Sequence, residues 1–212
     1  MISVEQYRTY VGNLKRTLDA LPLELIEATV EQIHLARVNQ RQVFIMGNGG
    51  SAATASHFAC DLGKNTVMAG FPRLRVQSLN DNMAFFSACA NDYGYDTVFA
   101  EQLTNFIQPE DVVLAISASG NSANVLKAVQ VARAGGAFTI GWSGYQGGKL
   151  AKMVDLPIVI PSDSIEQIED IHLMMAHMVT VSVRKAAQNG FLLNHNQAFP
   201  AVMTDPVVVV AR

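Results

Sequence analysis

The chain has 212 residues, of which half are hydrophobic and 16% are charged, and its formal net charge is −3 at pH 7. This length is typical of one domain, and the lack of a basic excess argues against binding to a nucleic-acid backbone. No apolar run reaches the ~20 residues of a membrane span, and the first ten residues do not follow the pattern of a signal peptide. Cys60 and Cys89 fit neither a disulfide framework nor a zinc-finger spacing. We therefore expect a cytoplasmic protein with neither nucleic-acid nor membrane partners.

Two helices are expected first, over residues 3–39, because apolar side chains recur there at three- and four-residue steps. The segment from Val43 to Met46 is a short continuous apolar run, as expected of a strand that is buried on both faces. A glycine-rich turn and a helix over about 52–63 follow this strand. The first seventy residues therefore predict a helical pair, a buried strand and a third helix.

Strands and helices continue to alternate along the rest of the chain. Further strands are expected at 73–78, 112–116, 137–142 and 156–160, and further helices at a segment ending near 91–92, at 123–134 and at 165–188. This order predicts an α/β fold with a parallel five-stranded sheet and helices on both faces, a flavodoxin-like three-layer sandwich. We expect one domain over residues 1–190, which includes the N-terminal helical pair, and a C-terminal extension over 191–212.

The first chemical motif is the turn Gly47-Asn48-Gly49-Gly50-Ser51, between a buried strand and a helix. Glycines let backbone N–H groups approach an anion at the positive end of a helix, and Ser51 adds a hydroxyl donor. The motif lacks the Gly-Lys-Ser/Thr of a P-loop and the third glycine of a dinucleotide fingerprint. A tight turn that merely needs glycines is the structural alternative.

The second motif is Ser117-Ala118-Ser119-Gly120-Asn121-Ser122, which also follows a buried strand and begins a helix. Its serine hydroxyls lie beside unpaired backbone donors, although a helix start with extra capping residues is an alternative explanation. In open parallel sheets ligands bind at the carboxyl ends of the strands, so we expect both turns at one edge. A neutral, serine-rich site suits a phosphomonoester better than a nucleoside triphosphate.

Four segments together resemble the sugar isomerase (SIS) domain of the phosphoheptose isomerases, and the resemblance extends from about residue 5 to 190. They are Gly47-Asn-Gly-Gly-Ser51, Ala90-Asn-Asp-Tyr-Gly94, Ser117-Ala-Ser-Gly-Asn-Ser122 and Ile168-Glu-Asp-Ile-His172. The resemblance implies an enzyme that interconverts sedoheptulose 7-phosphate and D-glycero-D-manno-heptose 7-phosphate. It also implies a homotetramer whose sites are shared between subunits.

The resemblance places the substrate contacts at defined positions of this chain. They are Asn48, Gly49, Gly50, Asn91, Asp92, Ser117, Ser119 and Ser122. We add Ser51 and Glu169 to this substrate-binding set. Ala118 replaces a threonine that is usual in the family, which removes one hydroxyl, but the backbone N–H at this position is kept. Phosphate binding is therefore expected to survive the change.

The resemblance also implies one zinc ion per subunit, bound by His57, Asp61, Glu169 and His177, with Asp61 and His177 as the acid–base pair. The family has Glu where this chain has Asp61 and Gln where it has Glu169, and both changes keep an oxygen ligand. His57 and Asp61 lie ~40° apart around a helix, so they can converge on one ion. Glu169 and His177 lie ~12 Å apart along theirs, so an ion between them would need both side chains at full reach.

These residues can also be explained without any catalytic or metal-binding role. His57 and Asp61 can be an ordinary surface pair, and Glu166, Glu169 and Asp170 can be a solvated acidic face at a helix start. Whether Asp61 is a base or a metal ligand stays open. We interpret His172 as a packing residue.

The motifs and the resemblance together imply three candidate functions. The first is an aldose–ketose isomerase of heptose phosphate that works through an enediol. The alternatives are a non-catalytic SIS protein that acts as a sugar-phosphate sensor or adaptor, and an isomerase of another phosphosugar. Retention of a carboxylate at Asp61 and of His177 favours the enzyme.

Overall fold

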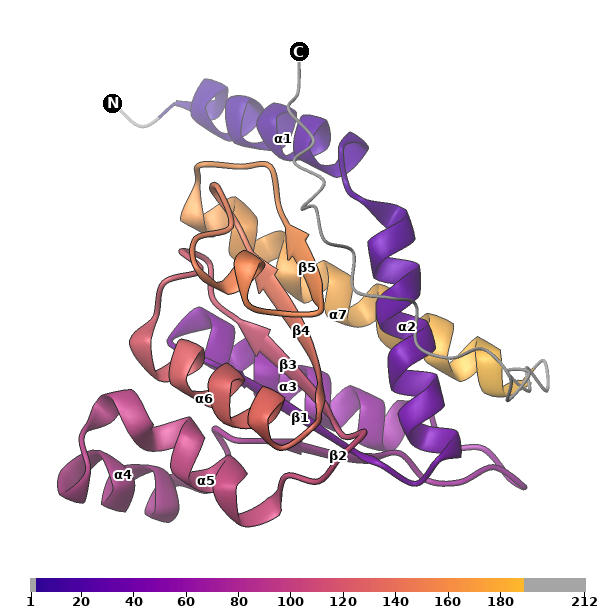
Figure 1. Ribbon diagram of the computed structural model, residues 1–212. Helices are drawn as coiled ribbons and strands as arrows, with labels where there is room; N and C mark the ends of the chain where they lie inside the picture. Colours follow the sequence, from indigo (N-terminus) through magenta and orange to yellow (C-terminus); the bar gives the residue numbers. More distant parts are fainter. Residues whose placement is uncertain (1–2, 189–212) are drawn as a thin grey trace.

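A computed structural model describes residues 3–188 of the chain. Its centre is a sheet of five parallel strands in the order β2-β1-β3-β4-β5 (Figure 1). The strands are β1 (Gln42–Gly47), β2 (Arg75–Ser78), β3 (Val112–Ile116), β4 (Phe138–Ser143) and β5 (Leu156–Val159). The predicted α/β fold with a parallel five-stranded sheet is confirmed. The expected C-terminal extension, residues 191–212, lies outside the described residues.

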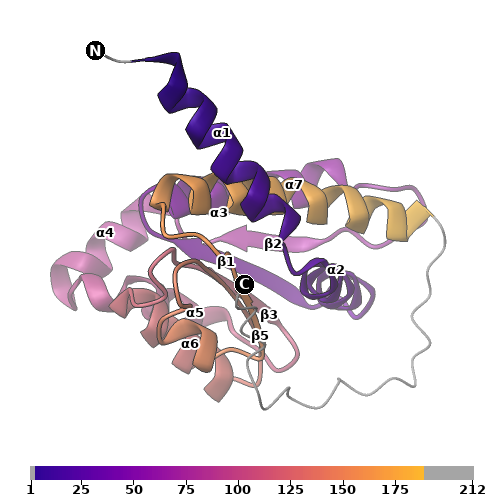
Figure 2. The same cartoon turned by 90° about the horizontal axis from the view of Figure 1, so that it is seen from above.

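Helices cover both faces of the sheet (Figures 1 and 2). One layer consists of α2 (Leu23–Val38), α3 (Gly50–Asn65) and α7 (Ile165–Gln188). The other layer consists of α4 (Met83–Asp92), α5 (Val98–Phe106) and α6 (Ala123–Ala134). Single 3₁₀ turns, η1 (Tyr95–Thr97) and η2 (Leu150–Lys152), precede α5 and β5. None of the helices within residues 3–188 is both long and apolar enough to cross a membrane.

The first helix, α1 (Val4–Asp19), projects away from the body of the domain (Figure 2). Leu14 and Leu18, in its second half, pack on the core. Near its middle, the Tyr10 hydroxyl donates a hydrogen bond to Asp170 Oδ2 on α7 (2.5 Å), and this bond raises the pKa of Tyr10 to about 12. The helical pair predicted over 3–39 is thus confirmed as two helices, with α1 anchored mainly by its C-terminal half.

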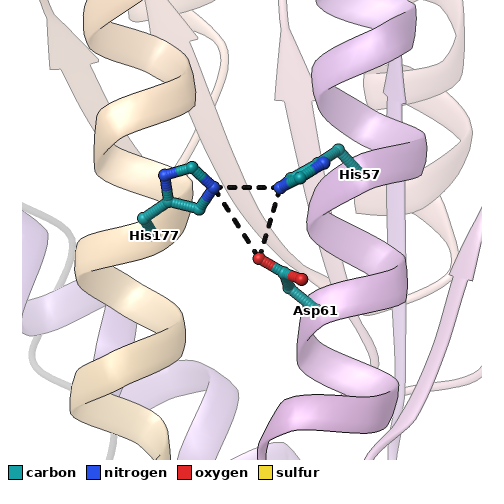
Figure 3. Close-up of side chains that lie close together, drawn as sticks. All are labelled: His57, Asp61 and His177. Carbon is teal, nitrogen blue, oxygen red and sulfur yellow. Dashed lines mark hydrogen bonds and ion pairs between the residues drawn. The ribbon is translucent and has the colours of Figure 1, made fainter.

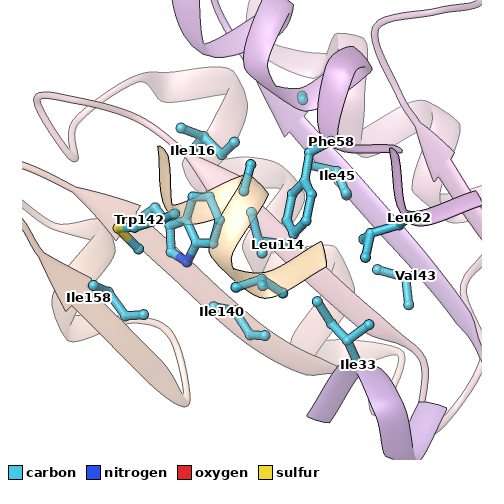
Figure 4. Close-up of a cluster of buried hydrophobic side chains, with 14 of the residues drawn as sticks. Ile33, Val43, Ile45, Phe58, Leu62, Leu114, Ile116, Ile140, Trp142 and Ile158 are labelled. Atoms are coloured by element: carbon cyan, nitrogen blue, oxygen red, sulfur yellow. The ribbon is translucent and has the colours of Figure 1, made fainter. Parts of the chain in front are cut away.

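The core consists of two apolar clusters, one on each face of the sheet. Val43 and Ile45 of β1 belong to the cluster under α2, α3 and α7, together with Phe58 and Trp142 (Figure 4). The intervening Phe44 and Met46 belong to the cluster under α4, α5 and α6. Because successive strand side chains point to opposite faces, a strand that is buried on both faces must be apolar at every position. This explains the continuous apolar runs in the sequence.

One helix was not expected from the sequence. Only a single helix was predicted between β2 and β3, but α5 follows α4 after the 3₁₀ turn. Val98, Phe99 and Leu103 of α5 are fully buried in the second cluster. Phe99 and Leu103 are four residues apart, which is a helical spacing, but the segment is short. The predicted helix bounds also differ by two residues at each end of α3, which runs from Gly50 to Asn65.

Candidate active site

The glycine turn between β1 and α3 depends on the small size of its residues. A Cβ on Gly47 would come within 2.7 Å of Ser51 atoms, and Gly49 has a φ of +55°, where side chains are strained. The Asn80 side chain holds the turn from the β2 side: it donates to the Gly47 carbonyl (2.9 Å) and accepts from the Gly47 N–H (3.3 Å). As a result α3 begins at Gly50, with its unpaired N–H groups next to the turn.

The serine turn between β3 and α6 is held by its own polar groups. The Ser117 hydroxyl donates to Ser122 Oγ (3.1 Å), and the Asn121 N–H donates to Ser119 Oγ (3.2 Å). Gly120, with a φ of +63°, approaches the backbone of Gly147 so closely that a Cβ would lie 2.1 Å from the Gly147 oxygen. Ser117 is buried and Ser119 is exposed. The turn therefore offers an exposed hydroxyl on a tightly packed backbone.

Both turns lie at the same edge of the sheet, as predicted. In the ladder that joins β1 to β3, Gly47 is paired with Ile116, so the two strands end side by side. A pocket of about 280 Å³ opens against the glycine turn. Its lining includes Asn48 and Gly49 from the turn, Ala52 and Ser56 from α3, Asn80, and Met83, Phe86 and Tyr95 on the α4 side.

Three of the four predicted metal ligands converge between α3 and α7. The ligand atoms of His57, Asp61 and His177 all lie within 4.8 Å of one another (Figure 3). The two Nε2 atoms are 2.9 Å apart, and Asp61 Oδ2 lies 3.3 Å from His57 Nε2 and 3.8 Å from His177 Nε2. The other Asp61 oxygen accepts a hydrogen bond from Asn65 Nδ2 (2.8 Å). The two imidazoles are about half exposed, whereas the Asp61 side chain is 19% exposed.

Glu169, the fourth predicted ligand, is not part of this group. Its carboxylate lies over Gly50, where an added Cβ would be 2.5 Å from both oxygens. Gly50 and His57 are separated by seven residues, or about 10 Å along α3, because each residue of an α-helix rises ~1.5 Å. Glu169 is thus at the glycine turn, two helical turns away from the histidines. The four-ligand set is reduced to three in the described chain.

Asn91 and Asp92 lie at the C-terminal end of α4 and are exposed. Asn91 Nδ2 donates to Asp92 Oδ1 (2.8 Å), and within residues 3–188 neither residue is part of the pocket lining. Ser51 is buried under the first turn of α3. The structure therefore brings the predicted glycine and serine residues to one edge, but it leaves Asn91 and Asp92 apart from the pocket.

His172 has a packing role, as interpreted from the sequence. It is buried on α7 beside Trp142, with ring centroids 6.0 Å apart. Burial lowers its pKa to about 4, so the imidazole is neutral near pH 7. It takes no part in the cluster of His57, Asp61 and His177.

Sequence reasoning missed three residues around the turns: Asn80, Tyr95 and Asn124. Asn80 holds Gly47, Tyr95 lines the pocket, and the buried Asn124 bonds to Asn48. Asn124 follows the serine motif by two residues, and a polar side chain at the start of an otherwise apolar helix face was the signal for it. Asn80 and Tyr95 carry no such signal, because only the folded chain brings them to the turn.

Comparison with known proteins agrees with this architecture. Residues 6–144 match the SIS domain family. The chain is 38% identical over 175 residues to the phosphoheptose isomerase of Helicobacter pylori (strain P12). This alignment covers 82% of this chain and 90% of that protein. It is 38% identical over 168 residues to the phosphoheptose isomerase of Mycobacterium tuberculosis (strain CDC 1551 / Oshkosh), covering 79% and 85%.

Solved structures show the same likeness. The phosphoheptose isomerase of Francisella tularensis superposes with a TM-score of 0.81 at 29% identity, over 87% of this chain and all of that one. The enzyme of Neisseria gonorrhoeae superposes with a TM-score of 0.78 at 28% identity, over 85% and 98%. By fold, motifs and identity over most of its length, the chain belongs to the phosphoheptose isomerase family of SIS-domain proteins.

Proposed function

We propose that the chain is a phosphosugar isomerase that interconverts sedoheptulose 7-phosphate and D-glycero-D-manno-heptose 7-phosphate through an enediol. The family relationship supports this activity. The structural observation that carries it is the cluster of His57 and Asp61 on α3 with His177 on α7, because the N-terminus of α3 also forms the glycine turn. A phosphate at the two turns and a carbonyl at the cluster would thus be parts of one site.

The spacing of these two parts supports a seven-carbon substrate. The cluster begins about 10 Å along α3 from Gly50. An extended chain advances ~1.2 Å per bond, so eight bonds from C1 to phosphorus span about 9–10 Å in a heptose 7-phosphate. The corresponding span in a pentose 5-phosphate is about 7 Å. The longer substrate can hold its phosphate at the turns while C1 and C2 reach His57, Asp61 and His177.

The side chains of the cluster can carry out the proton transfers of an aldose–ketose isomerisation. Asn65 holds one oxygen of Asp61, and the other oxygen faces the two imidazoles. We assign Asp61 as the base that takes the proton from C1 of the ketose and returns it to C2. His177 gives a proton to the carbonyl oxygen and takes one from the neighbouring hydroxyl, so the overall proton balance is zero.

The cluster also fits a divalent metal. Two imidazoles and one carboxylate, with ligand atoms within 4.8 Å of one another, are the donor set of a three-ligand zinc site that keeps one position open. Zinc held by His57, Asp61 and His177 would polarise the substrate carbonyl. An ion bound to Asp61 reduces the basicity of that carboxylate, so metal occupancy and proton transfer at Asp61 compete for the same oxygen.

We propose in addition that the protein works in the cytoplasm as a homotetramer. Val4 and Tyr7 on the projecting helix α1 are 65% and 63% exposed, and Val11 extends this apolar face. An exposed apolar helix face of this kind is typical of a subunit interface.

The test uses the purified full chain with sedoheptulose 7-phosphate. It follows product formation and the exchange of deuterium from solvent into C2, with and without a chelator. We expect turnover in the wild type and a loss of about 10²–10⁴-fold in kcat for Asp61→Asn and His177→Ala. Lys64→Gln, an exposed change one turn further along α3, is the control and should keep full activity. Full turnover by both site variants would remove the assigned roles, and binding without exchange would indicate a sensor.

A further inference from the structure

Asn48 is the centre of a hydrogen-bond network that joins three segments of the chain. Asn48 Nδ2 donates to Asn124 Oδ1, and Asn124 Nδ2 donates back to Asn48 Oδ1, both at 2.9 Å. The hydroxyl of Tyr95 also donates to Asn48 Oδ1, at 2.9 Å. The network therefore connects the glycine turn to the first turn of α6 and to the 3₁₀ turn between α4 and α5.

The orientation of both amides follows from the backbone. Asn124 Oδ1 also accepts the backbone N–H of Val125 (2.9 Å), and only an oxygen can face that donor. With Asn124 Oδ1 fixed, Asn48 must present Nδ2 to it, and Asn48 Oδ1 must then face Asn124 Nδ2 and Tyr95. Within residues 3–188, one of the two Nδ2 hydrogens of Asn48 remains uncommitted, and Asn48 lines the pocket at the glycine turn.

Asn124 is almost completely buried, with 2% of its surface exposed. Burial of an amide costs free energy unless hydrogen bonds replace its water contacts, and these bonds are what Asn48 and Val125 provide. The β1–β3 ladder ends at Gly47 and Ile116, so it does not hold the turns beyond that point. The Asn48–Asn124 pair spans the gap between the glycine turn and the serine turn where the sheet no longer does so.

A second tie supports the Tyr95 side of the network. Lys127 on α6 forms an ion pair with Asp96, the residue after Tyr95. The Tyr95 ring packs edge-on against Phe86 of α4, with ring centroids 5.8 Å apart. The 3₁₀ turn is thus held against α6 and α4. These contacts fix the position from which the Tyr95 hydroxyl donates to Asn48.

We propose that Asn124 and Tyr95 are positioning residues of the phosphosugar site, and that both act through Asn48. They fix the spacing of the two turns and the amide orientation of Asn48, so that its remaining N–H points to an oxygen of the bound substrate. This inference rests on the proposed function, because the ligand that Asn48 would contact is the phosphosugar. In this proposal Asn48 contacts the ligand directly, whereas Asn124 affects ligand binding only by positioning Asn48.

Three substitutions separate the parts of the network. Asn124→Asp keeps the size and the acceptor that faces Val125 but removes the donor to Asn48, so two oxygens then face each other. Asn124→Ala removes both bonds. Tyr95→Phe keeps the ring against Phe86 and removes only the hydroxyl. Asn105→Asp is the matched control, because Asn105 is exposed on α5 and lies with the starts of β1 and β2 at the opposite edge of the sheet.

The experiment measures kcat and KM for sedoheptulose 7-phosphate, the affinity for inorganic phosphate, and the thermal unfolding midpoint of each variant. A hydrogen bond of this kind corresponds to about 2- to 10-fold in affinity, so we expect Tyr95→Phe to raise KM by that factor. We expect about 10-fold or more for Asn124→Asp, because an unpaired oxygen and a charge are added. In every case kcat should change little, because Asn48 binds ground state and transition state alike. Asn105→Asp should match the wild type.

A double-variant cycle tests whether Asn124 acts through Asn48. In an Asn48→Ala background, Asn124→Ala should raise KM no further, since its partner is already gone. The proposal is overturned if Asn124→Ala lowers the unfolding midpoint but leaves KM unchanged, or if its effect on KM is undiminished in that background. Failure of the proposed function is a separate outcome: the wild type would then not turn over the sugar, while the variants would still weaken phosphate binding.

Discussion

The carboxylate of Glu169 lies directly over Gly50, the first residue of α3, and a Cβ at this glycine would be 2.5 Å from both carboxylate oxygens. The first turn of a helix carries partial positive charge and unpaired N–H groups. Glu169 therefore places a negative charge beside the N–H groups that an anionic ligand of the glycine turn would contact. Its charge opposes that ligand and is itself stabilised by the helix.

Replacement of Glu169 by Gln is expected to strengthen the binding of inorganic phosphate by about 2- to 5-fold at low salt, the size of a single charge effect at a helix terminus. High salt should reduce the difference, because it screens the charge. Titration calorimetry measures both. Glu166→Gln is the control, since Glu166 is exposed and accepts a hydrogen bond from the hydroxyl of Ser164, which immediately precedes α7. Weaker phosphate binding by Glu169→Gln would mean that the carboxylate does not compete.

The three-ligand cluster predicts a difference between Asp61 and Glu169 in metal binding. We expect His57→Ala and Asp61→Asn to lower the affinity for zinc by at least about 10- to 100-fold, because each removes a ligand atom. Glu169→Gln should leave that affinity unchanged. Competition with a fluorescent chelator gives the affinities, and bound metal per chain checks them. An equal loss in Glu169→Gln would restore the four-ligand set.

Stability should depend on His172 in mild acid. The pKa of His172 falls from 6.5 to about 4 on folding, so below pH 6.5 the unfolded chain binds a proton that the folded chain does not. The free energy of unfolding should therefore fall between about pH 6.5 and 4, by up to ~1.4 kcal/mol per pH unit. Urea unfolding at a series of pH values measures this slope. His172→Phe should flatten it above pH 5, and an unchanged slope would assign the effect to other groups.

Two glycines make a matched pair for packing. A Cβ on Gly144 would lie 2.2 Å from Ile168 Cδ1 in the core, whereas nothing lies within 4 Å of a Cβ on Gly12 in α1. We expect Gly144→Ala to destabilise the fold by about 1–3 kcal/mol through overpacking. Gly12→Ala should stabilise α1 by about 0.5–1 kcal/mol. Chemical denaturation gives both values, and Ile168→Val should recover part of the Gly144→Ala loss. Equal stability of the two alanine variants would argue against this close contact.

The helix α5 shows where the local sequence pattern was insufficient to predict secondary structure. Its nine residues are apolar enough to be buried, but the helix is too short for periodicity to separate it from a loop. Its stability comes from packing on α6, a segment that follows it in the chain by more than fifteen residues. The long helix α7 was predicted because it repeats the same pattern over 24 residues.

The sequence by itself determined the parallel strands, the helices other than α5 and the two turns at the carboxyl edge of the sheet, because these depend on local apolar patterns and on glycine and serine placed between strand and helix. The family resemblance also grouped His57, Asp61 and His177, together with Glu169. Only the tertiary structure decided that Glu169 lies at the glycine turn rather than with the histidines, and that Asn124 and Tyr95 meet at Asn48. The physical reason is that these relationships depend on how α7, α6 and the 3₁₀ turn pack in space, and no local spacing encodes that packing.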